Sequence, residues 1–233
     1  MTRAELFAAT LVAVAPRPTA SPGPLGVSAD VTLDRQGTAL LAPFSVAITL
    51  HNAANHVVQL RFPTADLFRI DVLRDEAPVW SSVTGHKPIP ITRQLDVPPG
   101  NLRVAQVIVD STTDDRRAFA PGRYTVRVAM LGSNFGVVVA KPVTFDPPAT
   151  IATAFSTKPG TVITIAGEPY VDGGTPRLRD GTGTIRLSRA LGMRPTGTYV
   201  VRGFLDAAGD ERVFDVGRSA PAFENAPTPR PQS

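Results

Sequence analysis

Several features of catalytic and metal-binding proteins are missing from this sequence. It has no cysteine and only three histidines in 233 residues, which excludes disulfides, thiolate nucleophiles and cysteine-ligated zinc or iron–sulfur sites. His51 and His56 flank one turn, but no carboxylate lies at ligand spacing from them. Neither a Gly-x-Ser-x-Gly elbow nor a His-Glu-x-x-His motif occurs. We therefore expect a protein that is not an enzyme and has no metal and no cofactor.

Long hydrophobic runs are also scarce. The run from Leu6 to Ala15 follows Arg3 and has the length of a signal-peptide core, which is too short to span a bilayer. The proline-rich segment "PRPTASPGP" comes next, so residues 1–26 are predicted to be a signal peptide and a linker. This predicts an extracytoplasmic protein, periplasmic or secreted, with no membrane span in the mature chain. The alternative is a short N-terminal helix in a cytoplasmic protein.

Charge is neither strong nor concentrated. The net charge of +4 is not gathered in a tail or a long basic run, so the sequence does not demand a nucleic acid or a membrane as partner. The acidic residues give no sign of a catalytic pair, and we expect them in polar loops rather than as buried carboxylates with shifted pKa values. The residues in question are Asp71, Asp75, Glu76, Asp114 and Asp115.

Proline and glycine are abundant instead. The 23 prolines and 19 glycines indicate many short strands joined by turns. Phe44, Val46, Ile48 and Leu50 alternate with smaller or polar residues, the pattern of a strand with one buried face. About seven such strands predict an all-β fold, with an immunoglobulin-like antiparallel β-sandwich over residues 27–146. The predicted strands are residues 27–33, 44–50, 58–62, 68–72, 102–109, 124–130 and 137–145.

The turns within this stretch carry a family resemblance. The order "FSVAITLHNAANHVVQLRFPTADLFRIDVLRDEAPVW", then "LDVPPG", then "PGRYTVRV" resembles the BsuPI family of intracellular proteinase inhibitors over about residues 28–145. The resemblance implies the sandwich fold and a protein partner, with a serine proteinase as the partner class. The family often has a second tryptophan in a later strand, whereas Trp80 is the only tryptophan here.

A second all-β unit is expected after "FDPPAT" at residues 145–150, because two prolines stop any strand there. Five short strands are predicted at residues 161–166, 175–179, 184–188, 199–205 and 211–216. Their order resembles the OB-fold domains of bacterial proteins and predicts a small OB-like five-stranded barrel over residues 152–220. Residues 221–233 are rich in proline and are predicted to be a disordered tail.

The hairpin "RLRDGTGTIRLS" brings three arginines together. With a loop of two or four residues, Arg177 faces Arg186 and Arg179 faces Thr184, while Leu178 and Ile185 point into the core. One interpretation is that Arg177, Arg179 and Arg186 bind an anion or a single-stranded nucleic acid. The other is a solvated face whose arginines pair with nearby carboxylates, for which Asp206, Glu211 and Asp215 are available. The hairpin has no aromatic residue for base stacking, so nucleic acid is the less favoured partner.

One loop, "SSVTGHKPIPITRQ" at residues 81–94, could act on a protein partner. Two prolines stiffen its core of Lys87, Pro88, Ile89 and Pro90, as in a substrate-like proteinase inhibitor. Prolines in such a place can instead protect a sheet edge from aggregation. With the BsuPI resemblance, this loop makes a non-catalytic binding protein the favoured functional hypothesis, and anion or nucleic-acid binding by the arginine face the alternative.

Overall fold

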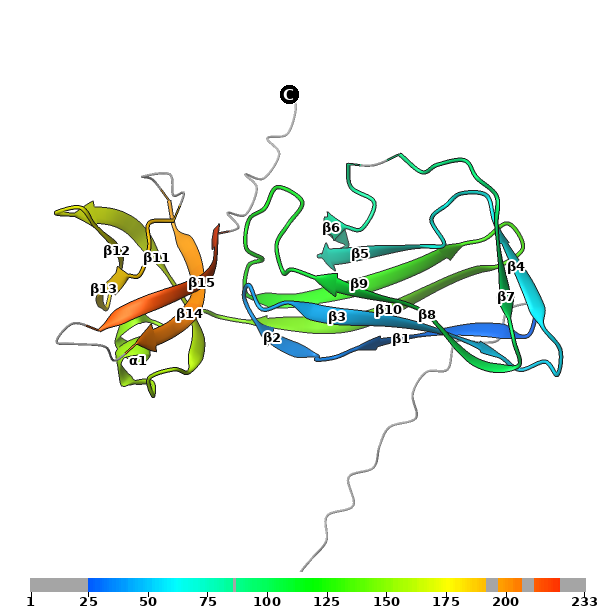
Figure 1. Cartoon of the computed structure of the whole chain (residues 1–233), viewed down its shortest axis with the longest axis horizontal. Helices are drawn as coiled ribbons and strands as arrows, with labels where there is room; N and C mark the ends of the chain where they lie inside the picture. Colours follow the sequence, from blue (N-terminus) through cyan, green and yellow to red (C-terminus); the bar gives the residue numbers. More distant parts are fainter. Residues whose placement is uncertain (1–24, 86, 192–196, 207–211, 223–233) are drawn as a thin grey trace, which may run out of the picture.

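The computed structural model describes residues 25–85, 87–191, 197–206 and 212–222. Fifteen strands and one short helix lie in these ranges, so the prediction of an all-β fold is confirmed. A β-sandwich forms one end of the elongated molecule and a β-barrel forms the other (Figure 1). The predicted signal segment up to residue 24 and the tail from residue 223 lie outside the described ranges, so these two predictions stay untested.

The sandwich consists of two main sheets and a small third one. The first sheet has the order β1-β3-β8 and the second the order β2-β10-β9-β5-β6, and all neighbours are antiparallel except β10 and β2. β4 and β7 form the two-stranded third sheet. The strands are β1 (Val27–Leu33), β2 (Gly37–Ala39), β3 (Phe44–Asn52), β4 (Val58–Phe62), β5 (Phe68–Arg74), β6 (Ala77–Ser81), β7 (Arg93–Val97), β8 (Gly100–Val109), β9 (Gly122–Leu131) and β10 (Gly136–Asp146).

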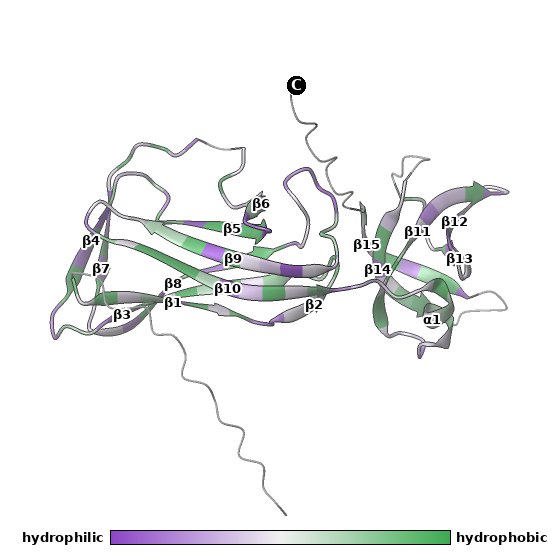
Figure 2. Cartoon of the chain, turned by 180° about the vertical axis from the view of Figure 1, so that it is seen from behind, coloured by the Kyte–Doolittle hydropathy of each residue, from purple (hydrophilic) through white to green (hydrophobic). Residues whose placement is uncertain are grey.

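The sandwich therefore has ten strands, whereas about seven were expected. The three additional strands, β2, β6 and β7, have at most one buried residue each, whereas the equally short β4 buries three in alternation. The alternation that could be read in β3 corresponds to its burial, since every second side chain from Phe44 to Leu50 is buried. Hydrophobic and hydrophilic residues share each strand (Figure 2), as expected for sheets that bury one face.

The second unit is a closed barrel in the strand order β11-β12-β13-β15-β14, with β13 and β15 parallel. Its strands are β11 (Val162–Asp172), β12 (Thr175–Asp180), β13 (Gly183–Leu187), β14 (Tyr199–Asp206) and β15 (Val213–Pro221). The five expected strands are present, but β15 extends to Pro221, where the tail was predicted to begin. The helix α1 (Ile151–Ser156) was not predicted, and its buried Ile151 and Ala154 belong to the barrel core.

The barrel and the sandwich pack tightly against each other, and we call their interface the seam. Val200 and Ala220, on the outside of the barrel, are buried in the same cluster as the sandwich core. The backbone N–H of Ala118 in the sandwich donates to the carbonyl of Pro221 at 2.8 Å. The hydroxyl of Thr164 in β11 donates to the carbonyl of Leu40 at 3.0 Å. Apolar burial and hydrogen bonds together therefore fix the barrel against the sandwich.

Candidate functional site

The predicted binding loop connects β6 to β7 on the side of the sandwich that carries β5 and β6 (Figure 1). Lys87, Pro88, Ile89 and Pro90 are all exposed, as expected. Ile89 and Ile91 leave 56% and 55% of their surface in solvent. Two large apolar side chains two residues apart are thus available for a partner.

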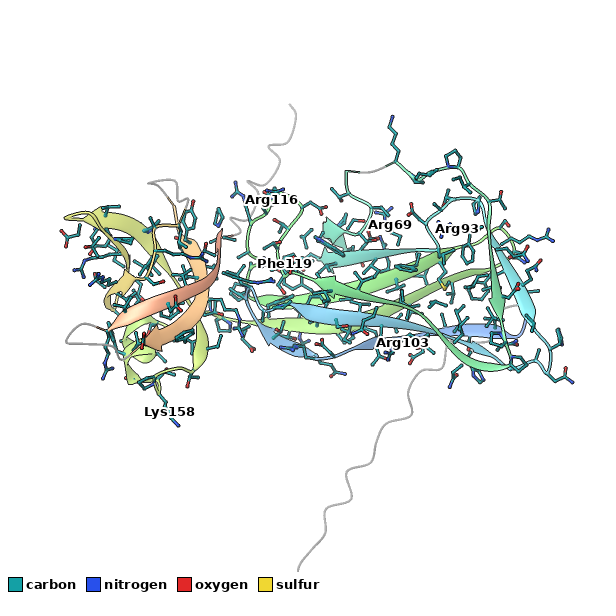
Figure 3. All side chains as sticks on the ribbon, viewed as in Figure 1. Arg69, Arg93, Arg103, Arg116, Phe119 and Lys158 are labelled. Atoms are coloured by element: carbon teal, nitrogen blue, oxygen red, sulfur yellow. The ribbon has the colours of Figure 1, made fainter. Side chains whose placement is uncertain are left out.

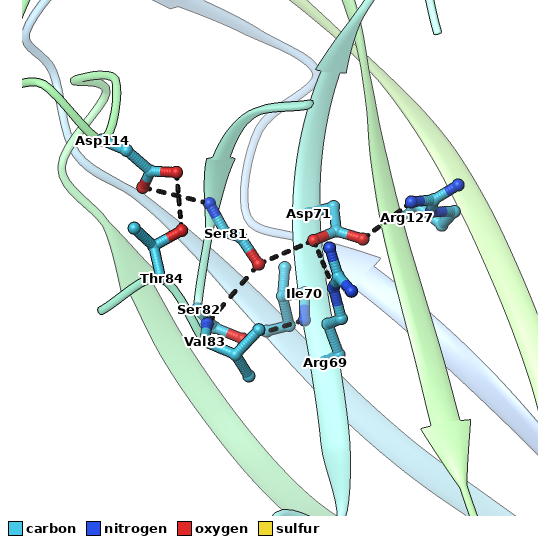
Figure 4. Close-up of polar contacts among 9 residues, drawn as sticks. All are labelled: Arg69, Ile70, Asp71, Ser81, Ser82, Val83, Thr84, Asp114 and Arg127. Carbon is cyan, nitrogen blue, oxygen red and sulfur yellow. Dashed lines mark hydrogen bonds and ion pairs between the residues drawn. The ribbon is translucent and has the colours of Figure 1, made fainter. Parts of the chain in front are cut away.

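The base of this loop is tied to the edge of the second sheet. Ser82 continues the ladder beyond β6, because its backbone N–H donates to the Ile70 carbonyl at 2.9 Å and its hydroxyl accepts from the Ile70 N–H at 3.0 Å. The carboxylate of Asp114 accepts from the Ser81 N–H at 3.3 Å and from the Thr84 hydroxyl at 2.7 Å. A turn follows, in which the Thr84 N–H donates to the Ser81 carbonyl at 3.2 Å. Figure 4 shows the contacts of Asp114 with Ser81 and Thr84, and the contact of the Ser82 hydroxyl with Ile70.

Asp71 in β5 joins this network through the hydroxyl of Ser81 at the base of the loop. Its carboxylate is almost fully buried and accepts hydrogen bonds from Arg69 Nε at 2.8 Å, Arg127 Nη2 at 2.9 Å and Ser81 Oγ at 2.7 Å. Burial on its own raises the pKa of Asp71, but the hydrogen bonds from Arg127, Arg69 and Ser81 outweigh it and the net pKa is lowered. Asp71 therefore stays ionised, with two guanidinium groups and a loop hydroxyl around it.

This placement corrects the expectation for the acidic residues. Asp71 was assigned to a polar loop, whereas it lies in β5, is 1% exposed and has a lowered pKa. The sequence carried one signal for it: Asp71 stands between Ile70 and Val72 at an outward position of an alternating strand, and Arg127 has the same place in β9. The β5–β9 register makes these two residues direct cross-strand partners.

The middle of the loop is held as well. The carbonyl of Ile89 accepts from the backbone N–H of Ala65 at 3.0 Å and from that of Ile91 at 2.8 Å. The first bond joins the loop to the turn between β4 and β5, and the second closes a tight three-residue turn around Pro90. A shallow hollow remains beside the loop base, lined by Ala65, Asp66, Leu67, Phe68, Ser82, Val83 and Arg93. Arg69 and Arg93 mark this side of the sandwich in Figure 3.

The arginine hairpin has the register that was predicted. Arg177 pairs with Arg186, Leu178 with Ile185 and Arg179 with Thr184. Leu178 and Ile185, which were predicted to point into the core, are buried.

The hairpin arginines, however, have carboxylate neighbours. Arg177 Nε lies 3.3 Å from Asp172 Oδ2, and Arg179 Nη2 lies 3.0 Å from Glu168 Oε2. The Arg179 guanidinium also stands 5.6 Å from the centre of the Tyr170 ring. Arg186 has an interaction partner too. These contacts favour the interpretation of a solvated, ion-paired face over an anion site.

The carboxylate partners of Arg177 and Arg179 differ from those proposed from the sequence. Asp172 and Glu168 come from β11, which lies beside β12 in the barrel. Asp215 accepts from the hydroxyl of Ser188 at 2.8 Å instead, and Glu211 lies outside the described residues. A β11 that reaches Asp172, longer than predicted, explains the difference.

His51 and His56 each contact a different asparagine. His51 Nδ1 lies 2.9 Å from Asn101 Oδ1, and His56 Nδ1 lies 3.3 Å from Asn55 Oδ1. Within the described ranges, no group of three or more histidine or acidic side chains could hold a metal ion. In the same ranges, no helix has the length and hydrophobicity needed to cross a membrane.

Comparisons with known proteins add little to this geometry. No family model matches the chain, and no curated protein matches it. Solved structures with a partial similarity to this chain include a β-glucosidase from Erythrobacter marinus, with 14% identity over 51% of this chain and a TM-score of 0.31. A β-glucosidase from Listeria innocua in complex with gluconolactone has 13% identity over 52% of this chain and a TM-score of 0.32. The chain spans 15% and 16% of the length of these two proteins. At these TM-scores the likeness supports no functional argument.

Proposed function

We propose that this chain is a non-catalytic binding protein that recognises another protein through the loop between β6 and β7. The observation that carries the proposal is the exposed segment from Lys87 to Ile91, which is held at its base and in its middle by hydrogen bonds to the sandwich. An exposed loop without such bonds would lose conformational entropy on binding. A loop held in one shape before it meets a partner loses less, and this raises affinity.

The composition of the loop tip fits a protein partner. Ile89 and Ile91 offer apolar surface to bury, and each square ångström of apolar surface removed from water contributes about 25 cal/mol. Lys87 adds one charge next to them. Pro88 and Pro90 lack a backbone N–H and have a fixed φ, so the segment cannot join a neighbouring sheet as a regular strand. These features favour recognition by side chains rather than by strand addition.

A serine proteinase is the partner class that we propose, on the basis of the BsuPI resemblance and of Lys87. A lysine side chain on a stiff, exposed segment can enter the specificity pocket of a trypsin-like enzyme, where an aspartate receives it. The residue after it is Pro88, which has no N–H and would resist cleavage of the Lys87–Pro88 bond. The expected behaviour is inhibition with slow or absent cleavage after Lys87.

The test is inhibition of a panel of trypsin-like serine proteinases by the full chain. Lys87→Ala is expected to weaken inhibition by about tenfold or more, the loss typical of a central interface residue. The matched control is Lys158→Ala, because Lys158 is an exposed lysine on the barrel (Figure 3) and is far from the loop. This control variant should inhibit like the unchanged protein.

Two outcomes would contradict parts of the proposal. If the unchanged chain inhibits none of the enzymes at micromolar concentration, the proteinase is the wrong partner class. If Lys87→Ala inhibits as well as the unchanged chain, the loop is not the contact surface.

A further inference from the structure

Three arginines gather where the barrel meets the sandwich. Arg202 lies in β14, with Thr164 of β11 as its cross-strand partner on one side and Arg218 of β15 on the other. Cross-strand partners point to the same face of a sheet. This is the outer face of the barrel, which packs on the sandwich through the neighbouring Val200 and Ala220. Arg35 lies in the turn between β1 and β2 of the sandwich, and its charge is near enough to lower the pKa of Arg202.

Two of these arginines have a carboxylate partner. Arg218 Nη1 lies 2.8 Å from Asp110 Oδ1, which joins the barrel to the sandwich. Arg35 Nη2 lies 3.4 Å from Asp34 Oδ2. Arg202 differs, because its Nη1 donates to the hydroxyl of Thr164 at 3.2 Å. In the part of the chain that the structure describes, no carboxylate lies within ion-pair distance of Arg202.

The surroundings of Arg202 are therefore unfavourable for a cation. Its side chain is half-buried, and the hydroxyl that it contacts is itself committed as a donor to the Leu40 carbonyl. Burial lowers the pKa of Arg202, and the charges of Arg35 and Arg218 lower it further. Arginine keeps its proton in proteins despite such effects, so an uncompensated positive charge stays at the seam.

In the same barrel, the positive charges of two hairpin arginines are compensated by carboxylates. Arg177 and Arg179 each have a carboxylate of β11 within 3.3 Å. Arg202 of β14 also faces β11, but its cross-strand partner there is the neutral Thr164. Like charges directly opposite each other destabilise a sheet. A bound anion would remove that cost.

We propose that the seam is a binding site for a small tetrahedral oxyanion, of the phosphate or sulfate class, held by Arg202 together with Arg35 and Arg218. The guanidinium of Arg202 has five N–H donors in a fixed fork, of which one is used by Thr164. Such a fork matches two oxygens of one oxyanion. Because Arg35 belongs to the sandwich and the other two to the barrel, the anion would also link the two units.

The experiment is thermal unfolding of the full chain during titration with inorganic phosphate, with sodium chloride adjusted to keep the ionic strength constant. The unfolding temperature of the unchanged protein should rise with the logarithm of phosphate concentration, because a ligand that binds only the folded state stabilises it by mass action. Arg202→Gln should remove this rise. Arg35→Gln should weaken it, and Arg35 is an exposed residue.

The control variant is Arg103→Gln, which removes an exposed arginine from the sandwich strand β8 (Figure 3) and should keep the full response to phosphate. Without phosphate, Arg202→Gln should unfold at the same temperature as the unchanged protein or higher, because a like-charge repulsion is gone. A merely structural role for Arg202 would lower that temperature instead.

Titrations with other anions test whether the site prefers tetrahedral oxyanions. Sulfate should act like phosphate, and acetate should act more weakly because it carries one charge. The proposal is overturned if the unchanged protein shows no response to phosphate beyond that to chloride. It is also overturned if Arg202→Gln keeps the full response, which would mean the general stabilising effect of such anions on folded proteins.

Discussion

Asp71 in the sandwich and Asp180 in the barrel are both carboxylates that organise a neighbouring segment, but they do so with different partners. Asp71 is buried in the middle of a sheet and accepts from two guanidinium groups and one hydroxyl. Asp180 lies in the hairpin turn, where its Oδ1 accepts from the Thr182 N–H, the Thr182 hydroxyl and the Gly183 N–H. Its Oδ2 accepts from the Ile151 N–H at 2.8 Å, at the start of α1.

The difference shows two ways to stabilise a loop from a strand. At Asp180, most partners are backbone N–H groups that no other acceptor would satisfy, so the carboxylate replaces missing secondary-structure bonds at the turn and at the first turn of α1. At Asp71, the partners are charged side chains, so the carboxylate compensates two cations and fixes the loop only through Ser81. The first kind depends on hydrogen-bond acceptance and the second on charge.

The same isosteric substitution at both positions tests this distinction, and the larger effect is expected at Asp71. In the unchanged protein, each carboxylate oxygen of Asp71 accepts from an arginine. In Asp71→Asn, the amide NH2 must therefore face a guanidinium, and both cations lose their counter-ion. We expect a loss of about 2–3 kcal/mol in the free energy of unfolding, in the range for breaking buried polar contacts. Denaturant unfolding measures it.

The control for this prediction is Asp146→Asn, which changes an exposed aspartate of β10 and should alter stability by no more than about 0.5 kcal/mol. A loss at Asp71 no greater than that of the control would mean that the network contributes little. The loop would then have to keep its shape by the backbone bonds at Ser82 and Ile89.

A smaller loss is expected for Asp180→Asn. The amide oxygen of asparagine can keep the three bonds made at Oδ1, and only the bond from Ile151 N–H to Oδ2 is lost. The expected cost is about 1 kcal/mol, as for the loss of one helix-capping bond. Denaturant unfolding under the same conditions gives the comparison. If Asp180→Asn costs as much as Asp71→Asn, the charge of Asp180 matters more than its hydrogen bonds.

Much of this architecture could be predicted from the sequence because it depends on local patterns. The hairpin register around Asp180 follows from the turn, since loops of two and four residues give the same pairing. The exposure of Lys87 and Ile89 could be expected because they lie in a proline-containing loop, and loops run over the protein surface. β3 could be recognised because its alternation spans nine residues.

The contacts that join distant segments could not be predicted in the same way. Arg127 is 56 residues from Asp71, and Arg218 is 108 residues from Asp110, so neither pair leaves a local pattern. The sequence separated the two units at the prolines after Phe145, and it gave no sign that Val200 and Ala220 are buried against the sandwich. β7 was missed because Val97 is its one fully buried residue, whereas its partner β4 buries three residues in alternation.

The smallest effect that we predict is a difference between pH profiles. Folding lowers the pKa of Asp71 from 3.8, so its carboxylate contributes stability that is fully present above that value and is lost as the pH falls through the folded-state pKa. Asp71→Asn has no proton to bind at this position, so the gap in stability between the unchanged protein and the variant should be widest near neutral pH and should shrink steadily below pH 4. The pKa of Asp180 is lowered as well, because hydrogen bonds from Ile151, Thr182 and Gly183 outweigh the effect of burial, and its variant should show the same sign. Unfolding by urea at a series of pH values between neutral and acid gives both gaps. A gap at Asp71 that does not change with pH would mean that its loss of stability comes from packing and not from the charge that two arginines hold in place.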